Sequence, residues 1–225
     1  MSGESAQGDA VLRRAMFVLE LVDPVTGVPV GFEMEANAEG LRAPSVTRAG
    51  QLVWLDVDPA ADRSIKVSAT ARRRQYAPFA AVLAIAKRTP GVAPPRIRRE
   101  LQPTGLYQPP SGRLATAGMV IADAQTRAPI VGAQVVLALA AGDLGTTMHS
   151  NLVAISDERG GFVAVAAGLG NDKPKPAPRP APDGSVVGWL EISWQGVMRK
   201  TAEIALRQSQ LNYLPEPLIW AELTP

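Results

Sequence analysis

Two stretches of the chain repeat one pattern and decide the fold: residues 17–30 are FVLELVDPVTGVPV, and residues 117–130 are AGMVIADAQTRAPI. Both contain Asp-x-x-Thr-x-x-Pro followed by Val or Ile, and they lie 100 residues apart. An aspartate that ends a strand can accept hydrogen bonds from backbone N–H groups of the following turn. The proline then fixes φ as the chain enters the next strand. Each stretch therefore predicts a strand, a turn and a second strand.

Two further matches follow in the same order. Residues 47–55 (TRAGQLVWL) correspond to residues 157–165 (DERGGFVAV) with an offset of 110, and a glycine ends each polar turn. Residues 65–68 (IKVS) correspond to residues 190–193 (LEIS) with an offset of 125, and both alternate as a half-buried strand does. Three matches in one order, with insertions confined to loops, predict an internal duplication.

At these residues the chain resembles the carboxypeptidase regulatory-like, or transthyretin-like, β-sandwich domains. The second copy fits the family pattern at Asp123, Pro129, Ile130, Gly132, Ala133, Val135, Ser156, Asp157, Gly160 and Phe162. The first copy fits less closely, because Gly31 and Phe32 stand where the family has Gly-Ala, and Thr47 replaces an aspartate. The resemblance implies a Greek-key sandwich in each copy and an accessory role, as a folding aid, spacer or docking module. Some tandem sandwiches of this kind accompany phage-tail-like contractile particles.

We therefore expect an all-β protein of two tandem Greek-key (transthyretin-like) β-sandwich domains. The 20 glycines and 20 prolines favour short strands and turns over long helices. The expected order is a flexible N-terminal arm (1–12), a first sandwich (13–99), a proline-rich connector (100–112) and a second sandwich (113–225). The growing offset places long loops of the second copy at residues 140–150 and 171–184. Residues 77–87 are apolar and fit either a short helix or a buried strand.

Composition excludes several classes of function. The chain has no cysteine, so disulfides, thiolate metal sites and cysteine nucleophiles are ruled out. Its single histidine, His149, falls in the expected loop 140–150 without a nucleophile elbow, and we interpret it as an exposed loop residue. Phosphate-binding loops and acidic calcium motifs do not occur in the sequence. The sequence predicts a protein that is not an enzyme and needs no cofactor or metal, with an enzyme based on His149 as the third alternative.

The sequence also bears on location and on the class of partner. The first ten residues lack the basic start and apolar run of a secretory signal, and no run of 18 apolar residues occurs. We expect no membrane span, and a place in the cytoplasm or in a particle assembled there. The net charge of +2 is too small to favour nucleic acid as the partner, so other protein subunits, or the chain itself, are expected.

The candidate partner-binding residues are of three kinds: basic residues, a tryptophan that is expected to be exposed, and residues of the apolar C-terminal segment. They are Arg72, Arg73 and Arg74; Lys173, Lys175 and Arg179 in the loop PKPAPRP; Trp194; and Leu211, Tyr213 and Leu214 near the C-terminus. A proline-rich basic loop is extended and can order against a neighbouring subunit. Trp189 and Trp194 lie five residues apart, so on one strand they face opposite sides and one of them is exposed.

The leading hypothesis is a non-enzymatic structural or adaptor subunit of a large protein assembly, with a phage-tail-like contractile particle as that assembly. The alternative is a carbohydrate-binding or surface-binding module that acts through an exposed tryptophan. Trp189 and Trp194 are both open to that role at this point.

Overall fold

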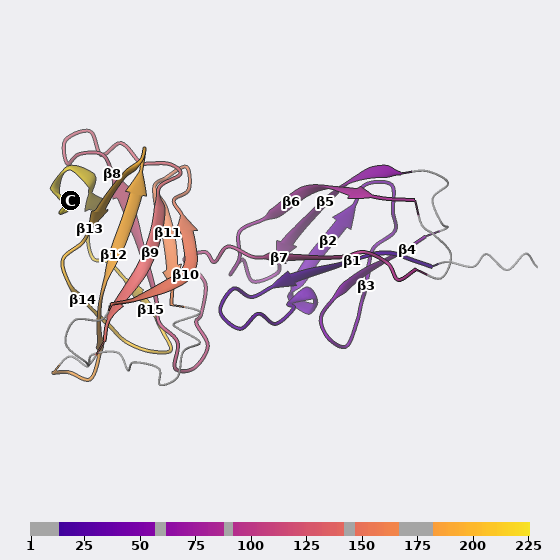
Figure 1. Ribbon diagram of the computed structural model, residues 1–225, viewed down its shortest axis with the longest axis horizontal. Helices are drawn as coiled ribbons and strands as arrows, with labels where there is room; N and C mark the ends of the chain where they lie inside the picture. Colours follow the sequence, from indigo (N-terminus) through magenta and orange to yellow (C-terminus); the bar gives the residue numbers. More distant parts are fainter. Residues whose placement is uncertain (1–13, 57–61, 88–91, 142–146, 167–181) are drawn as a thin grey trace, which may run out of the picture. The chain divides into compact units, whose positions relative to one another are not determined.

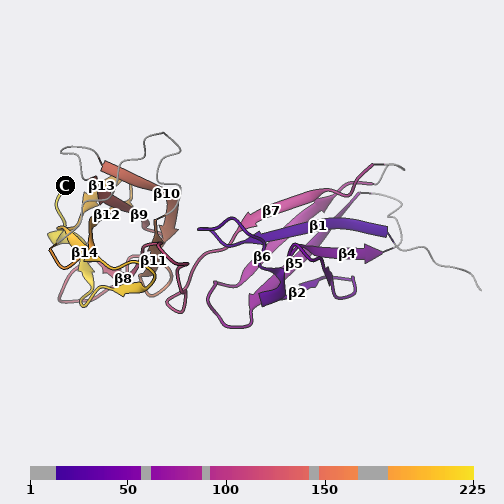
Figure 2. The ribbon, with the colours of Figure 1, turned by 90° about the horizontal axis from the view of Figure 1, so that it is seen from below.

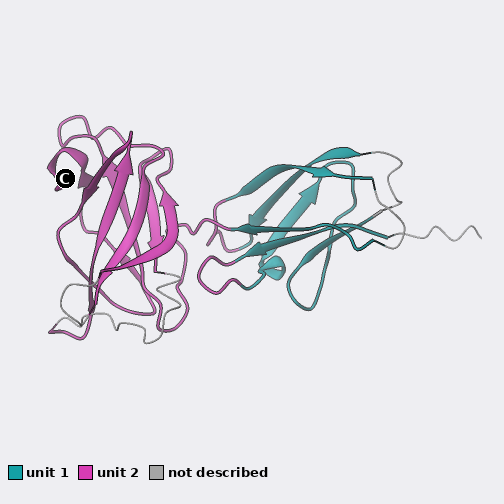
Figure 3. Ribbon diagram, viewed as in Figure 1, with its two compact units in different colours: residues 1–22, 28–72, 78–100 teal, residues 23–27, 73–77, 101–225 magenta. Residues whose placement is uncertain are grey.

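The computed structural model describes residues 14–56, 62–87, 92–141, 147–166 and 182–225. Over these residues the chain forms β-strands and two 3-10 helices without any α-helix, so the all-β prediction is confirmed. The strands form four sheets, divided between two compact units (Figure 3). Unit 1 comprises Met1–Val22, Val28–Arg72 and Pro78–Glu100; unit 2 comprises Asp23–Gly27, Arg73–Ala77 and Leu101–Pro225.

Unit 1 contains two sheets (Figure 1). One has the order β3 (Ser45–Val46), β4 (Leu52–Asp56), β1 (Arg14–Val22), β7 (Arg96–Glu100); the other has β2 (Met34–Ala38), β5 (Arg63–Ala71), β6 (Phe79–Ile85), with the 3-10 helix η1 (Gly31–Glu33) before β2. β1 pairs antiparallel with β4 and parallel with β7, whereas β5 pairs antiparallel with both of its neighbours.

Aromatic stacking lies at the centre of the unit 1 core. Phe17 on β1 and Trp54 on β4 are both fully buried, and their rings stack with centroids 4.8 Å apart. β5 alternates as its sequence predicts, because Ile65 and Val67 are buried while Lys66 between them is exposed. One face of that strand therefore contributes to the core and the other meets water.

Residues 77–87 contain a strand, β6, rather than a helix. Leu83 and Ile85 are buried, whereas Ala84 between them is exposed. This period of two requires an extended chain, because a helix would place residues three or four apart on one face. β6 pairs antiparallel with β5 along its full length.

Unit 2 also has two layers, with β9, β10, β12 and β13 on one side and β8 and β11 on the other (Figure 2). The larger sheet consists of β10 (Thr147–Ile155), β9 (Gln134–Ala140), β12 (Val186–Trp194) and β13 (Val197–Lys200), with β14 (Ile204–Leu206) also paired to β12. The smaller consists of β11 (Gly161–Val165), β8 (Ala115–Ile121) and β15 (Leu211–Tyr213), with β16 (Leu218–Ile219) also paired to β8 and the 3-10 helix η2 (Trp220–Glu222) after it.

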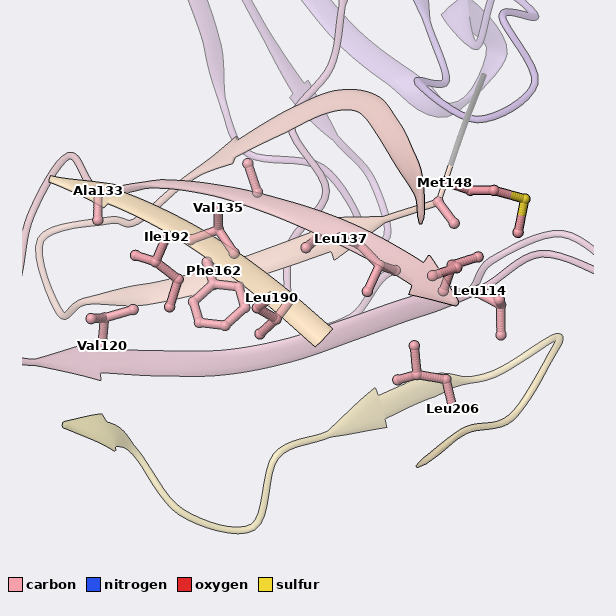
Figure 4. Packing of buried hydrophobic residues seen from close by; sticks show 14 of the residues in the cluster. Leu114, Val120, Ala133, Val135, Leu137, Met148, Phe162, Leu190, Ile192 and Leu206 are labelled. Atoms are coloured by element: carbon pink, nitrogen blue, oxygen red, sulfur yellow. The ribbon is translucent and has the colours of Figure 1, made fainter. Parts of the chain in front are cut away.

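The core of unit 2 is formed by apolar side chains from both of its sheets (Figure 4). Val120 and Phe162 come from β8 and β11, and they belong to one buried cluster with Leu137 on β9 and Leu190 and Ile192 on β12. A single core closed between two facing sheets is the packing expected of a β-sandwich.

The two units share a pattern of strand pairing. β8 pairs antiparallel with β11 and parallel with β15 and β16, as β1 does with β4 and β7. The order β9-β12-β13 likewise repeats the order β2-β5-β6. The matched residues 65–68 and 190–193 lie in β5 and β12, the strands that occupy corresponding places. The units differ at β10, which pairs with β9, whereas β3 pairs with β4.

The repeated Asp-x-x-Thr turns have the predicted hydrogen bonds. Asp23 Oδ1 accepts the backbone N–H groups of the residues two and three positions later, at 3.0 and 2.7 Å. Asp123 Oδ1 does the same at 2.9 and 2.7 Å. The hydroxyls of Thr26 and Thr126 also donate to these aspartates. The turn chemistry predicted from the sequence is therefore confirmed in both copies.

The expected loop 140–150 needs correction. Ala140 is the last residue of β9, and residues 147–150 belong to β10, which pairs with β9. His149 is consequently a strand residue and not a loop residue, because its segment extends the sheet. Residues 142–146 lie outside the described part of the chain, as do the expected arm at residues 1–12 and most of the expected loop 171–184.

The expected connector, residues 100–112, makes specific contacts within unit 2. The carbonyl of Gln102 accepts the N–H of Ala77 at 2.8 Å, and the N–H of Thr104 donates to the carbonyl of Gln75 at 2.9 Å. Tyr107 is buried. Part of this segment is therefore hydrogen-bonded to the turn Arg73–Ala77. In the described residues, no helix is long and apolar enough to span a membrane.

Candidate protein–protein interface

The predicted arginine cluster lies just beyond the end of β5. Arg72, Arg73 and Arg74 are all exposed. The guanidinium of Arg72 lies 3.8 Å from the Glu35 carboxylate, and both side chains are largely in solvent. Exposed ion pairs of this kind contribute at most about 1 kcal/mol to stability. Of the three arginines only Arg72 belongs to unit 1, and its charge already has a carboxylate neighbour.

The two tryptophans of β12 face opposite sides, as their spacing predicts. Trp194 packs against the hydrophobic core of unit 2 and meets Trp220 edge-on, with ring centroids 5.7 Å apart. Trp189 is half-buried on the other face, where its indole N–H donates to Glu191 Oε1 at 3.2 Å. His149 Nε2 lies 3.1 Å from the same oxygen. Trp189 is thus the tryptophan on the outer face, a choice between the two that the sequence leaves open.

The predicted C-terminal docking residues are largely taken up by their own sheet. Leu211 and Tyr213 are the first and last residues of β15, which pairs in parallel with β8. Leu214 packs against the core, close to Gly118, where an added Cβ would lie 2.7 Å from a Leu214 methyl. Only the Tyr213 side chain is well exposed, at 67%, and its hydroxyl donates to the carbonyl of Gly105. Backbone pairing with β8 explains why this apolar segment is not free.

The remaining predicted residues, Lys173, Lys175 and Arg179, lie outside the described residues.

A buried carboxylate, Asp23, lies in the turn after β1 and has a defined set of hydrogen-bond donors. Asp23 is 6% exposed, and its Oδ2 accepts the hydroxyls of Tyr76 and Tyr107, each at 2.8 Å. Burial raises the pKa of Asp23, but the hydrogen bonds from Thr26, Tyr76 and Tyr107 outweigh it and hold that pKa below its usual value. Burial, and the bond to Asp23, raise the pKa of Tyr107. Because every Asp23 oxygen is saturated by donors, the cluster stabilises the fold.

The surface feature that the sequence did not reveal is an unprotected outer strand, β6, in unit 1. Natural sheets protect their outer strands by making them short, charged or irregular, since a free edge pairs readily with another chain. In unit 1, β3 has only two residues, β7 is Arg-Ile-Arg-Arg-Glu, and β2 carries Glu35. β6, the remaining outer strand, has seven residues, Phe-Ala-Ala-Val-Leu-Ala-Ile, without a charge, a proline or a bulge.

The outward side of β6 is open in the part of the chain that the structure describes. Val82 is 64% exposed, and Ala80 and Ala84 on the same face are exposed as well. Apart from its pairing with β5, the backbone of β6 takes part in no hydrogen bond with a described residue. Every second N–H and C=O of an outer strand points away from its neighbour. β6 therefore presents an unpaired row of donors and acceptors flanked by small apolar side chains.

The sequence held a partial signal for this edge. The run from Phe79 to Ile85 is the most apolar in the chain's first half, yet a buried helix and a buried strand have the same composition over so short a run. Which strand ends a sheet depends on pairing between distant segments, which composition does not encode.

Comparison with known proteins adds no identity: no family model, no curated protein and no solved structure matches this chain. Function is therefore inferred from the chain's own geometry.

Proposed function

We propose that this protein is a non-enzymatic structural or adaptor subunit of a larger protein assembly, built from two tandem transthyretin-like Greek-key β-sandwiches. The observation that carries the proposal is the uncharged, unpaired edge of β6. The repeated pairing order of β2-β5-β6 and β9-β12-β13 supports the tandem arrangement.

Strand addition is the mode of association that this edge fits. An added strand gains backbone hydrogen bonds along its length, and alternate side chains then determine specificity. Val82, at 64% exposed, lies at the middle of β6 and would be covered by such a strand. The other outer strands of unit 1 carry the short length or charge that discourages pairing, which makes β6 the preferred point of attachment.

The assembly proposed is a phage-tail-like contractile particle put together in the cytoplasm. Its support is the resemblance of the repeated motifs, such as residues 123–130, to domains that accompany such particles. The basic proline-rich loop containing Lys173, Lys175 and Arg179 is proposed to contact an acidic neighbouring subunit.

Fractionation of the native cell tests the proposal. We expect the full chain to sediment with a large particle, and Val82→Lys to move it to the free fraction, because a lysine at the centre of the edge opposes strand pairing. Val131→Lys is the matched control, since Val131 is 54% exposed and lies outside every strand. The proposal fails if the wild-type chain is found only in the free fraction.

A second candidate function rests on the outer face of β12. Trp189 is half-buried beside Glu191 and His149, and an aromatic ring next to polar groups is the chemistry that stacks on and hydrogen-bonds a sugar. If this is the function, Trp189→Ala should abolish binding on a glycan array, while Tyr213→Ala, which removes another exposed aromatic ring, leaves it unchanged. An array without signal for the wild-type chain rejects this candidate.

A further inference from the structure

We infer that β6 pairs with β6 of a second copy of this chain, antiparallel and about a two-fold axis that passes beside Val82. This inference rests on the proposed function, because it names the strand that completes the open edge. The partner is the same strand, so the question is whether β6 is complementary to itself.

The side-chain sizes along β6 are suited to such self-pairing. With Val82 opposite the partner's Val82, the exposed face carries Ala80, Val82 and Ala84, a sequence of small, branched and small that is symmetric about its centre. On the core face, Phe79 lies opposite the partner's Ile85, and Ala81 lies opposite the partner's Leu83. Neither face places two large residues against each other at the centre, and β-branched pairs stabilise antiparallel strands.

Charge also favours a second copy on this edge. A two-fold axis places like charges near one another, so a charged strand repels itself. β7 contains Arg96, Arg98 and Arg99 and could not pair with its own copy without bringing those arginines together. The β5 residue paired with Val82 is Lys66, whose ammonium lies 3.8 Å from the Glu39 carboxylate. Two such lysines would be three strand spacings apart, about 14 Å, beyond the screening length of about 8 Å at physiological salt.

The ends of the strand define one register. Pro78 precedes β6 and has no N–H to donate, so the ladder cannot extend past it. Lys87 follows and its N–H already donates to Asp62 Oδ1 at 2.6 Å. The register centred on Val82 overlaps the seven residues of both copies completely. A shift by two residues would leave backbone groups unpaired at both ends.

The oligomeric state of the full chain gives the first test. Analytical ultracentrifugation should show a dimer that dissociates on dilution from about 100 μM. Val82→Lys places two ammonium groups directly opposite each other and should weaken the dimer at least about 100-fold, whereas Val131→Lys should leave it unchanged. A wild-type chain that stays monomeric at all concentrations overturns the inference.

Single cysteines test the register, and the chain helps because it has no cysteine of its own. Val82→Cys should cross-link to itself under mild oxidation or with a short bismaleimide, because directly opposed Cβ atoms lie about 5 Å apart. Ala80→Cys should not, since it faces the partner's Ala84 and lies about 14 Å from its own copy. Mixing Ala80→Cys with Ala84→Cys should restore cross-linking. Equal cross-linking by all single variants contradicts the two-fold axis at Val82.

The two proposals can fail separately. If the purified chain is monomeric but Val82→Lys still releases it from a sedimenting particle, the edge binds a different subunit, and the second copy is the wrong occupant. If the chain forms the Val82-centred dimer but never sediments with a particle, the second copy is right and the proposed function is wrong.

Discussion

Replacing Asp23 with asparagine is expected to lower the free energy of unfolding by about 3–5 kcal/mol, because hydrogen bonds to a charged acceptor contribute about 1.5–3 kcal/mol each. Asp23 is 6% exposed and accepts hydroxyls from Tyr76 and Tyr107 at 2.8 Å. Asparagine has the same shape but turns one oxygen into an NH₂ donor, which faces other donors. Urea denaturation followed by circular dichroism measures the loss.

Asp123→Asn is the matched control. Asp123 occupies the corresponding position of the second copy and makes the same turn bonds to Thr126, but in the described residues no tyrosine hydroxyl donates to it, and it is only partly buried. Its replacement should therefore have a much smaller effect than that of Asp23. Equal losses for the two variants would mean that the turn, and not the buried tyrosine pair, stabilises the fold at Asp23.

The same cluster gives a pH dependence. The pKa of Asp23 is lower in the folded chain than in the unfolded chain, so the unfolded state binds more protons between the two values. Its contribution is complete above the unfolded pKa of about 4 and is lost as the pH falls through the folded pKa. The Asp23→Asn variant should lose less stability than the wild type between about pH 5 and pH 3. Parallel curves for the two proteins would contradict this assignment.

Gly160→Ala is expected to destabilise unit 2 by about 2–5 kcal/mol. Gly160 has φ +76°, which costs a residue with a Cβ about 1–2 kcal/mol, and the added methyl would collide with the carbonyl oxygen of Val120 and crowd Pro129. The backbone oxygen cannot move without breaking strand β8, so overpacking adds about 1–3 kcal/mol more. Thermal or urea unfolding of the full chain measures the loss.

Gly132→Ala separates conformation from crowding. Gly132 has φ +75° but no atom within 4 Å of an added Cβ, so it should cost only about 1–2 kcal/mol. The first copy offers the same pair, because Gly50 (φ +76°) abuts the carbonyl of Pro29 while Gly40 (φ +74°) is open. If Gly132→Ala proves as damaging as Gly160→Ala, crowding against Val120 is not the cause.

The glycines at the two polar turns show which features of the fold can be predicted from local sequence. Gly50 and Gly160 each end a polar turn and each lie against the strand end that carries the repeated proline, Pro29 or Pro129. The two motifs matched along the sequence therefore touch in space. Positive φ at a polar turn is predictable from residue type, because only glycine adopts it without strain. The contact between each glycine and the proline segment could be seen only in the folded structure.

The candidate site was less predictable than the fold. Leu214 appeared available for docking because its segment is apolar, but β15 pairs with β8 and carries that side chain to the core. The sequence left open which of Trp189 and Trp194 faces outward; in the structure Trp194 packs against the core and Trp189 lies on the other face. The composition of an apolar C-terminal segment does not tell whether it packs on its own sheet or on another chain, because either contact buries the same apolar surface.

The sequence by itself determined the all-β class, the duplicated turns of Asp23 and Asp123, and the glycine positions, because those depend on hydrogen bonds and φ angles within a few residues. Only the tertiary structure decided that Tyr107 donates to Asp23, 84 residues away, and that β6 is the outer strand of unit 1 that is neither charged nor short. The reason is physical. Which strands pair depends on contacts between segments that are distant in the sequence. A strand lies at an open edge when no other segment of the chain pairs with its outer side, and local sequence does not encode that outcome.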